Sequence, residues 1–317
     1  MQYTNINHTN LTAGRLVLGT DTFGTLISKS DSYTLMDHFV EAGGNMIDTA
    51  SIYADWLGQG KSISEKTIGA WLVSSGCREN IIISTKGGHH DLQTLSSRLD
   101  LSNVRDDIQH SLENMHTDYI DIYWLHKDDL NQTPESLIEM LNEAAPKEYA
   151  HYLGVSNWTY DRIRTANNHA KKCGLRPIIA SQIQYSIAKP NYQPFGIVAM
   201  TDSEYRKYTA DTLNVFAFSS QAKGFFSKLD TQDADALPDN IKKLYLNQQN
   251  LNTAEKLKEL SQVTGLPIPS LVLAALLSNP DFPVFAQIGP RRLEELFSSL
   301  QAMDATLSAS QRDWLLQ

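Results

Sequence analysis

The 317-residue chain contains 41% hydrophobic and 20% charged residues, enough apolar material for a large buried core. Its formal net charge of −9 argues against a general nucleic-acid-binding surface, which needs clustered lysine and arginine. Two cysteines, Cys77 and Cys173, are too few for a disulfide framework. The N-terminal residues lack the pattern of a signal peptide, and the longest apolar run, 271–277, is too short to span a membrane. We therefore expect a cytoplasmic protein that binds neither membranes nor nucleic acid.

Eight short apolar runs alternate with segments of helical character, at 15–20, 45–50, 80–86, 119–126, 152–158, 178–186, 213–220 and 284–289. Continuous hydrophobicity is typical of parallel strands that helices cover. Eight repeats favour a single α/β domain over 1–317, a (β/α)8 TIM barrel, over a doubly wound open sheet. Residues 2–13 precede the first barrel strand, and we expect them to form a short N-terminal β-hairpin that closes the bottom of the barrel.

Helix-start signals stand at Ser62 with Glu65, Thr133 with Pro134, and Asn252 with Glu255, the last before a helix near 253–265. A stripe at helical spacing comprises Val104, Ile108, Leu112 and Met115. The polar segment 227–250 is weakly patterned, and we interpret it as a long functional or mobile excursion.

Polar residues stand at the carboxyl ends of three successive predicted strands. Asp48, Lys86 and His126 end the second, third and fourth strands, and Tyr53 follows Asp48 in the loop. In barrel enzymes such residues converge on the rim that carries the chemistry. Each alone is more commonly a cap, a packing residue or an ion-pair partner, but the four at matching positions form a specific combination.

These four groups suit carbonyl reduction by hydride transfer, in which the developing alkoxide needs a proton and electrostatic stabilisation. Free tyrosine has a pKa of about 10. We expect the Lys86 ammonium to lower the pKa of Tyr53 and Asp48 to orient Lys86. We expect His126 to hydrogen-bond the carbonyl oxygen of the substrate.

The segments 47–53, 85–88 and 124–126 resemble the catalytic tetrad motifs of the aldo-keto reductases, and the resemblance extends through most of the chain. It implies an NADP(H)-dependent oxidoreductase that reduces small aldehydes or ketones to alcohols. Tyr53 is then the general acid/base, assisted by Asp48, Lys86 and His126.

The segment 154–157, Gln182 and Phe218 resemble the parts of the family that hold and stack on the nicotinamide. Ser219, Gln221 and Lys223 would lie along the pyrophosphate. The full set of cofactor-binding residues that the resemblance implies is Gly19, Thr20, Asp21, Asp48, Ser156, Asn157, Gln182, Phe218, Ser219, Gln221, Lys223, Gly289, Arg291 and Arg292.

Arg291 and Arg292 open the last helix, where helix N-termini favour anions and arginine binds phosphate through paired hydrogen bonds. We assign them to the adenosine 2′-phosphate and expect NADP(H), with NAD(H) as the alternative. Glu295, Ser298 and Ser299 depart from the family pattern. Glu295 is four residues beyond Arg291, and pairing between them would weaken phosphate binding.

The family's Gly-x-Gly after the catalytic tyrosine is replaced by residues 54–56, an Ala-Asp-Trp sequence. Because Trp56 is so near Tyr53, we expect Trp56 and His126 to contact the substrate. His89 and His90 follow Lys86, and we interpret them as solvated loop histidines rather than as pocket residues.

Two other classes of function stay as alternatives. A non-catalytic regulatory subunit that binds a nicotinamide cofactor would use the same barrel. A metal-dependent barrel hydrolase would use Asp48, His89, His90 and His126, but they lack the usual spacing of metal ligands, and we expect no metal. The segment 58–62 ends like a phosphate-binding loop, but Asp55 stands where that motif needs glycine. Neither the physiological substrate nor the oligomeric state follows from the sequence.

Overall fold

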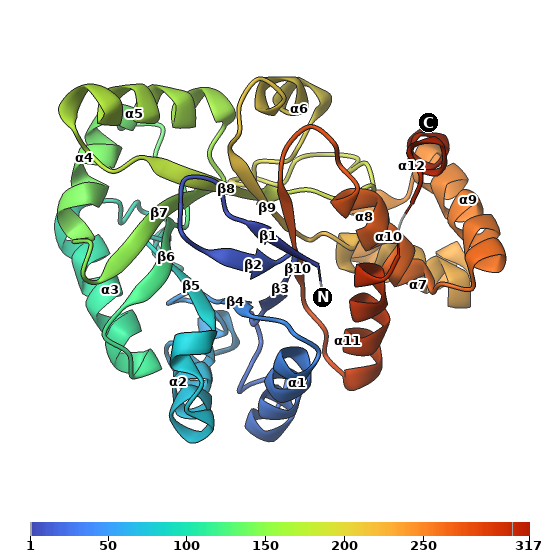
Figure 1. Ribbon diagram of the computed structural model, residues 1–317, viewed down its shortest axis with the longest axis horizontal. Helices are drawn as coiled ribbons and strands as arrows, with labels where there is room; N and C mark the ends of the chain where they lie inside the picture. The colour runs from blue at the N-terminus through green and yellow to red at the C-terminus, as the bar shows by residue number, and fades with distance from the viewer. Residues whose placement is uncertain (1, 306) are drawn as a thin grey trace.

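The structure is a computed structural model that describes residues 2–305 and 307–317. Eight parallel strands form a closed barrel in the order β10-β3-β4-β5-β6-β7-β8-β9 (Figure 1). The strands are β3 Leu16–Gly19, β4 Met46–Asp48, β5 Ile82–Gly87, β6 Ile120–Leu125, β7 Ala150–Ser156, β8 Ile178–Gln184, β9 Asn214–Phe218 and β10 Val284–Ile288. The predicted (β/α)8 TIM barrel is confirmed. Met1 and Thr306, part of the predicted domain, lie outside the described residues.

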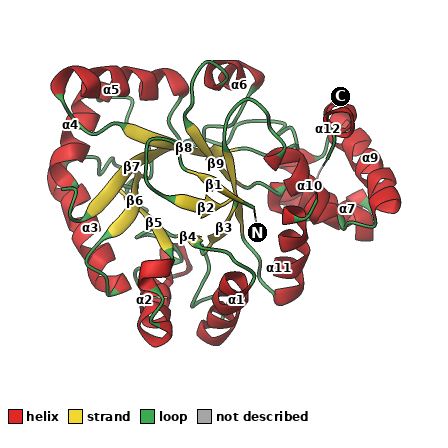
Figure 2. Cartoon of the chain, in the orientation of Figure 1, coloured by secondary structure: helices red, strands yellow, loops and turns green. Residues whose placement is uncertain are grey.

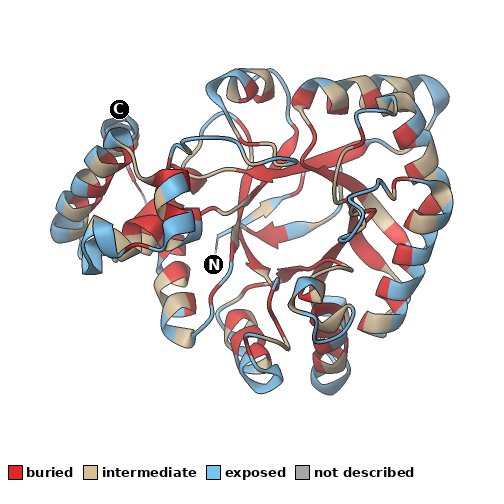
Figure 3. Cartoon of the chain, turned by 180° about the vertical axis from the view of Figure 1, so that it is seen from behind, coloured by how far each residue is buried: buried red, intermediate tan, exposed pale blue. Residues whose placement is uncertain are grey.

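Helices surround the barrel (Figure 2), and buried residues line the strands and the inner sides of the helices (Figure 3). The helices are α1 Lys29–Glu41, α2 Ile63–Ser75, α3 Leu101–Met115, α4 Pro134–Ala144, α5 Tyr160–Cys173, α6 Asp202–Tyr208, α7 Phe225–Thr231, α8 Asp239–Tyr245, α9 Gln248–Thr264, α10 Ile268–Leu277, α11 Leu293–Leu300 and α12 Ala309–Leu316. All four residues of the predicted stripe on α3 are buried, because they face the strands. Within the described residues, no single helix is long and apolar enough to cross a membrane; α9 and α10 pass that test only together, and the chain bends by 101° between them.

The N-terminal segment forms the predicted hairpin, in which β1 Tyr3–Asn5 pairs antiparallel with β2 Thr12–Gly14. Ile6 and Ala13 are fully buried and pack with the apolar residues inside the barrel. Asn214, the first residue of β9, accepts a hydrogen bond from the backbone N–H of Asn7 at 2.9 Å. The hairpin therefore closes the barrel at the amino ends of the strands, which leaves the carboxyl ends open for a site.

The helix start predicted at Ser62 is confirmed, since α2 begins at Ile63, but two of the three predicted capping interactions are wrong. Ser62 has a φ of 55° and its hydroxyl donates to the carbonyl of Ser51 at 2.8 Å, so it does not cap α2. Glu65 is fully buried and accepts hydrogen bonds from Thr85 and Ser111. The cap at Thr133 is confirmed, since its side chain accepts from the N–H of Ser136 at 3.1 Å.

The third helix, α9, starts five residues earlier than its predicted start at 253. Its cap is Asn247, whose side chain accepts from the N–H of Asn250 at 2.9 Å, and Asn252 lies inside the helix. The segment 227–250 is largely helical and contains the end of α7 and all of α8. Buried side chains of both helices, Phe225, Phe226, Ile241, Leu244 and Tyr245, pack against α9 and α10. Helices of seven residues are too short to show a clear period in the sequence.

Candidate active site

A buried lysine joins two of the predicted catalytic residues. Nζ of Lys86 donates to Oδ2 of Asp48 at 2.5 Å, to the carbonyl of Thr49 at 2.6 Å and to Oη of Tyr53 at 2.9 Å. Asp48 is the last residue of β4, and Lys86 lies near the end of the neighbouring strand β5. Both side chains are about 1% exposed, so the ion pair is shielded from solvent.

Asp48 has two further partners, both at Oδ1. The hydroxyl of Ser84 donates to it at 2.6 Å and the side-chain amide of Gln182, from β8, at 3.1 Å. Sequence reasoning missed Ser84. It stands two residues before Lys86 on the same strand, and the two-residue period of strands places both side chains inside the barrel. These hydrogen bonds fix the carboxylate that holds Lys86.

The loop after β4 places Tyr53 through its own hydrogen bonds. Its N–H donates to the carbonyl of Ala50 at 3.1 Å, and the N–H of Ser51 donates to the carbonyl of Lys86 at 3.0 Å. Ala54, which stands in the altered glycine motif, is fully buried with a φ of 72°. Glycine adopts this left-handed conformation more easily than alanine, which explains the use of glycine in the Gly-x-Gly motif that residues 54–56 replace.

His126 completes the cluster from the end of β6. Its ring lies edge-on to the ring of Tyr53, with centroids 5.9 Å apart, and to that of His89 at 4.8 Å. Nδ1 is buried and has no hydrogen-bond partner among the described residues. Burial and the Lys86 charge hold the pKa of His126 well below its usual range, so the imidazole is neutral at neutral pH. A neutral ring donates a hydrogen bond from one nitrogen only.

The expected lowering of the tyrosine pKa is wrong. Burial, followed by the charges of Asp48 and Asp21, raises the pKa of Tyr53 well above its ordinary value. Lys86 does not reverse this shift because Asp48 compensates its ammonium at 2.5 Å. Burial also lowers the pKa of Lys86, against the opposing effect of Asp48. Tyr53 is thus a protonated phenol, able to donate a proton.

The predicted nicotinamide-binding residues lie at the carboxyl ends of β7, β8 and β9. Ser156 and Asn157 are buried, and the amide of Asn157 donates to Ser156 at 3.1 Å and to the carbonyl of His126 at 3.3 Å. The N–H of Asn157 donates to the carbonyl of Gln182 at 3.0 Å. Phe218 ends β9 and is half-buried. This edge of the barrel therefore gathers amide and hydroxyl groups next to His126.

The other predicted cofactor residues follow β3, β9 and β10. Thr20 is fully buried and its hydroxyl donates to the carbonyl of Asp48 at 3.0 Å, which ties the end of β3 to β4. Burial raises the pKa of Asp21, and the charges of Arg291, Lys86 and Lys223 oppose that shift.

A side chain at Gly19 would approach the carbonyl of Ile288 within 3.2 Å, whereas the space beside Gly289 is open. The amide of Gln221 donates to Ser299 at 3.1 Å, and Ser219 precedes it in the loop with a φ of 51°.

The carboxylate of Glu295 forms an ion pair with the side chain of Arg292 and not with that of Arg291. Its Oε1 lies 3.1 Å from Nη2 of Arg292, and its Oε2 accepts from the backbone N–H of Arg291 at 2.8 Å. The predicted pairing with the Arg291 side chain is therefore wrong. The Arg291 side chain is exposed and forms no ion pair among the residues the structure describes.

Aromatic side chains from the neighbouring loops lie around Tyr53 and His126. Trp56 is 50% exposed, and its ring centroid lies 6.2 Å from that of Tyr53. His89 packs on His126 and is half-buried, so the interpretation of His89 as a solvated loop residue is wrong. His90 is also half-buried, with its ring 6.1 Å from that of His89.

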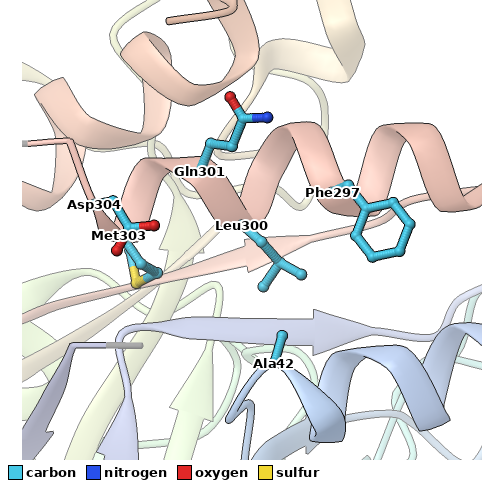
Figure 4. A pocket seen from close by; sticks show the side chains of 6 residues that line it. All are labelled: Ala42, Phe297, Leu300, Gln301, Met303 and Asp304. Carbon is cyan, nitrogen blue, oxygen red and sulfur yellow. The ribbon is translucent and has the colours of Figure 1, made fainter.

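Two other features lie apart from this site. A hollow of about 340 Å³ is lined by Ala42, Phe297, Leu300, Gln301, Met303 and Asp304, between the end of α1 and α11 (Figure 4), and contains none of the predicted site residues. Among the described residues, the donor atoms of His, Cys and carboxylate side chains converge in threes only at Glu139, His169 and Cys173. Asp48, His89, His90 and His126 make no such group, so the hydrolase alternative gains no support from geometry.

Comparisons with known proteins identify the family of the chain. The model of the Aldo/keto reductase family matches residues 15–315. The chain is 27% identical to the uncharacterized oxidoreductase YrpG of Bacillus subtilis, covering 97% of this chain and 92% of that protein. It is 26% identical to norsolorinic acid reductase B of Aspergillus parasiticus, covering 92% and 77%. It is also 26% identical to the aryl-alcohol dehydrogenase [NADP(+)] of Phanerodontia chrysosporium, covering 92% and 76%. The match over nearly the whole chain shows that the protein belongs to the aldo/keto reductase family of carbonyl-reducing oxidoreductases.

Proposed function

We propose that the chain, as one domain over 1–317, is an NADP(H)-dependent reductase of aldehydes and ketones with Tyr53 as general acid/base. The observation that carries the proposal is the hydrogen bond from Lys86 to Tyr53 at 2.9 Å. Lys86 also forms a buried ion pair with Asp48, and the ring of Tyr53 lies next to that of His126. The protonated phenol donates to the carbonyl oxygen, and the phenolate left behind is stabilised by the Lys86 ammonium. Neutral His126 donates a hydrogen bond that orients the same oxygen.

The residues present fit a nicotinamide dinucleotide. Ser156, Asn157 and Gln182 offer hydroxyl and amide groups beside the cluster, and exposed Lys223 and Arg291 offer cations to phosphates. The bound cofactor supplies the hydride. Because Arg291 forms no ion pair within the described part of the chain, we assign it to the 2′-phosphate and prefer NADP(H) to NAD(H). The name of the aryl-alcohol dehydrogenase [NADP(+)] agrees with this choice.

The loops around the site favour apolar substrates. Large apolar side chains are exposed in the loops that follow β4, β5, β6 and β8: Trp56, Leu92, Leu95, Leu130, Tyr192 and Phe195. Exposed apolar groups that cluster around a site favour binding of apolar ligands. Relatives named for aryl-alcohol and norsolorinic acid point the same way. We therefore propose aromatic or other apolar carbonyl compounds as substrates of a cytoplasmic enzyme.

The test is a panel of aromatic and small aliphatic aldehydes, with NADPH oxidation followed by absorbance and cofactor binding measured separately. We expect turnover with aromatic aldehydes and a lower KM for NADPH than for NADH. NADPH binding with no turnover across the panel would favour the regulatory subunit instead. A strong preference for NADH would overturn the assignment of Arg291.

A further inference from the structure

A cysteine, a histidine and a glutamate converge on the outer helical layer, away from the catalytic cluster. Glu139 lies on α4, and His169 and Cys173 lie one turn apart on the neighbouring helix α5 (Figure 1). Their donor atoms all lie within 4.8 Å of one another. Cys173 ends α5, shortly before the amino end of β8, whereas the catalytic cluster lies at the carboxyl ends of the strands. The two groups of residues therefore stand at opposite ends of the barrel.

The same nitrogen of His169 faces both of its neighbours. Nε2 lies 2.6 Å from Oε1 of Glu139 and 3.6 Å from Sγ of Cys173. A catalytic relay needs the imidazole to hold the carboxylate with one nitrogen and the thiol with the other. Donor atoms that meet at one point, without such a relay, are instead the arrangement of metal ligands. We propose that Glu139, His169 and Cys173 form a surface binding site for Zn²⁺.

The distances support a tetrahedral ion. Zinc binds sulfur at about 2.3 Å and imidazole nitrogen at about 2.0 Å, which separates the two ligand atoms by about 3.5 Å at a tetrahedral angle. The separation of Sγ and Nε2 is 3.6 Å. Oε1 of Glu139 must move away from Nε2 to about 3.3 Å for the same geometry. The Glu139 side chain is 58% exposed, so it has room to do so.

The ligand types select the metal. A thiolate, an imidazole and a carboxylate suit Zn²⁺ or Co²⁺, whereas Mg²⁺ and Ca²⁺ prefer oxygen ligands alone. Because the site is open to solvent, water fills the fourth position. On binding, the Cys173 thiol loses its proton to solvent. Nε2 of His169 also gives up the proton that it shares with Glu139, and the ring carries its remaining proton on Nδ1. The His169–Glu139 hydrogen bond is thereby replaced by two bonds to the ion.

The experiment titrates chelator-treated protein with Co²⁺ and follows the thiolate-to-cobalt absorption in the near ultraviolet. We expect one Co²⁺ per chain, and loss of the band when Zn²⁺ is added. Cys173→Ser abolishes the band, and His169→Ala weakens binding by at least about tenfold. Cys77→Ser is the matched control: Cys77 is half-buried, its Sγ contacts Ser75 at 3.0 Å, and the variant keeps the band.

A second measurement uses the intact protein without substitutions. Zn²⁺ at stoichiometric concentration protects Cys173, but not Cys77, from alkylation, as read by mass spectrometry of each peptide. The proposal is overturned if stoichiometric Co²⁺ gives no thiolate band, if Cys173→Ser keeps the band, or if Zn²⁺ leaves Cys173 as reactive as before. None of these readouts uses carbonyl turnover, so the result is independent of the proposed function.

Discussion

The ammonium group of Lys86 donates hydrogen bonds to Oη of Tyr53 at 2.9 Å and to Oδ2 of Asp48 at 2.5 Å, inside the carboxyl end of the barrel. The ion pair keeps the charge of Lys86 compensated while Tyr53 is neutral. Once Tyr53 has given up its proton, the ammonium has two anions to stabilise. In the proposed reaction Lys86 therefore stabilises the phenolate that proton transfer leaves behind, and it does not lower the pKa of the resting phenol.

Lys86→Met, compared with a double variant that also removes the Asp48 charge, separates the effect on activity from the effect on stability. We expect kcat to fall by at least about 10²-fold, because the phenolate loses its cation. We also expect a loss of about 3–5 kcal/mol in the free energy of unfolding, because the buried Asp48 carboxylate loses the only cation that compensates its charge among the described residues. Urea denaturation and steady-state kinetics measure the two effects. The double variant Asp48→Asn/Lys86→Met regains stability but not activity; recovered activity would argue against the role of Lys86.

His126 makes stability depend on pH in a defined direction. Its pKa is lowered in the folded protein, so below about pH 6.5 the unfolded chain binds the proton more readily. Stability is therefore lost as the pH falls below that value, by at most about 1.4 kcal/mol per pH unit, until the folded pKa is reached.

We expect His126→Gln to flatten this part of the stability curve relative to the unsubstituted protein. The matched control is His110→Gln, on the exposed face of α3, which should leave the slope unchanged. Thermal unfolding between pH 5 and pH 7, about the titration range of histidine, gives the slopes. Equal slopes in His126→Gln and the unsubstituted protein would mean that the imidazole is not held neutral.

Glu295 pairs with Arg292 at 3.1 Å, and under the proposed function this pair competes with the 2′-phosphate of the cofactor. Glu295→Gln frees this guanidinium, and we expect the KM for NADPH to fall by about 1.4- to fivefold with little change for NADH, since exposed pairs are worth about 0.2–1 kcal/mol. Glu294→Gln, the exposed neighbour on α11, is the control. An equal effect of both variants on both cofactors would show general electrostatics rather than contact with the 2′-phosphate.

Trp56 gives the site an apolar wall beside Tyr53. Trp56→Ala should lower kcat/KM for aromatic aldehydes by about tenfold and leave small aliphatic aldehydes nearly unchanged, because only the larger substrates reach the indole. Competition between the two substrate types measures this directly. A uniform loss for both types would place the role of Trp56 in positioning Tyr53.

Much of the fold followed from continuous apolar runs, since each of the eight predicted runs overlaps a barrel strand. The cluster of Asp48, Lys86 and His126 followed from strand register, because polar residues at the ends of neighbouring parallel strands lie at the same rim of the barrel. The capping interactions were harder to predict. Ser62 and Glu65 have the spacing of a capping box, yet the Glu65 side chain is buried and accepts hydrogen bonds from Thr85 and Ser111 instead. Local patterns do not reveal such distant partners.

The expected lowering of the Tyr53 pKa was wrong for the same reason. Sequence places Lys86 near Tyr53 but does not show that Asp48 compensates it or that burial outweighs both. Likewise, the i,i+4 spacing suggested Arg291 as the partner of Glu295, whereas the start of α11 brings Arg292 to it. Burial and loop conformation decide these matters, and both depend on the folded chain.

The most direct measurement is the rate of hydride transfer in a single turnover by Tyr53→Phe, with NADPH affinity measured on the same preparation. Losing the phenolic proton should slow the step by about 10²–10⁴-fold. The affinity for NADPH should change little, because the ring remains in place. A Tyr53→Phe enzyme that reduces an aromatic aldehyde as fast as the unsubstituted protein would contradict the account.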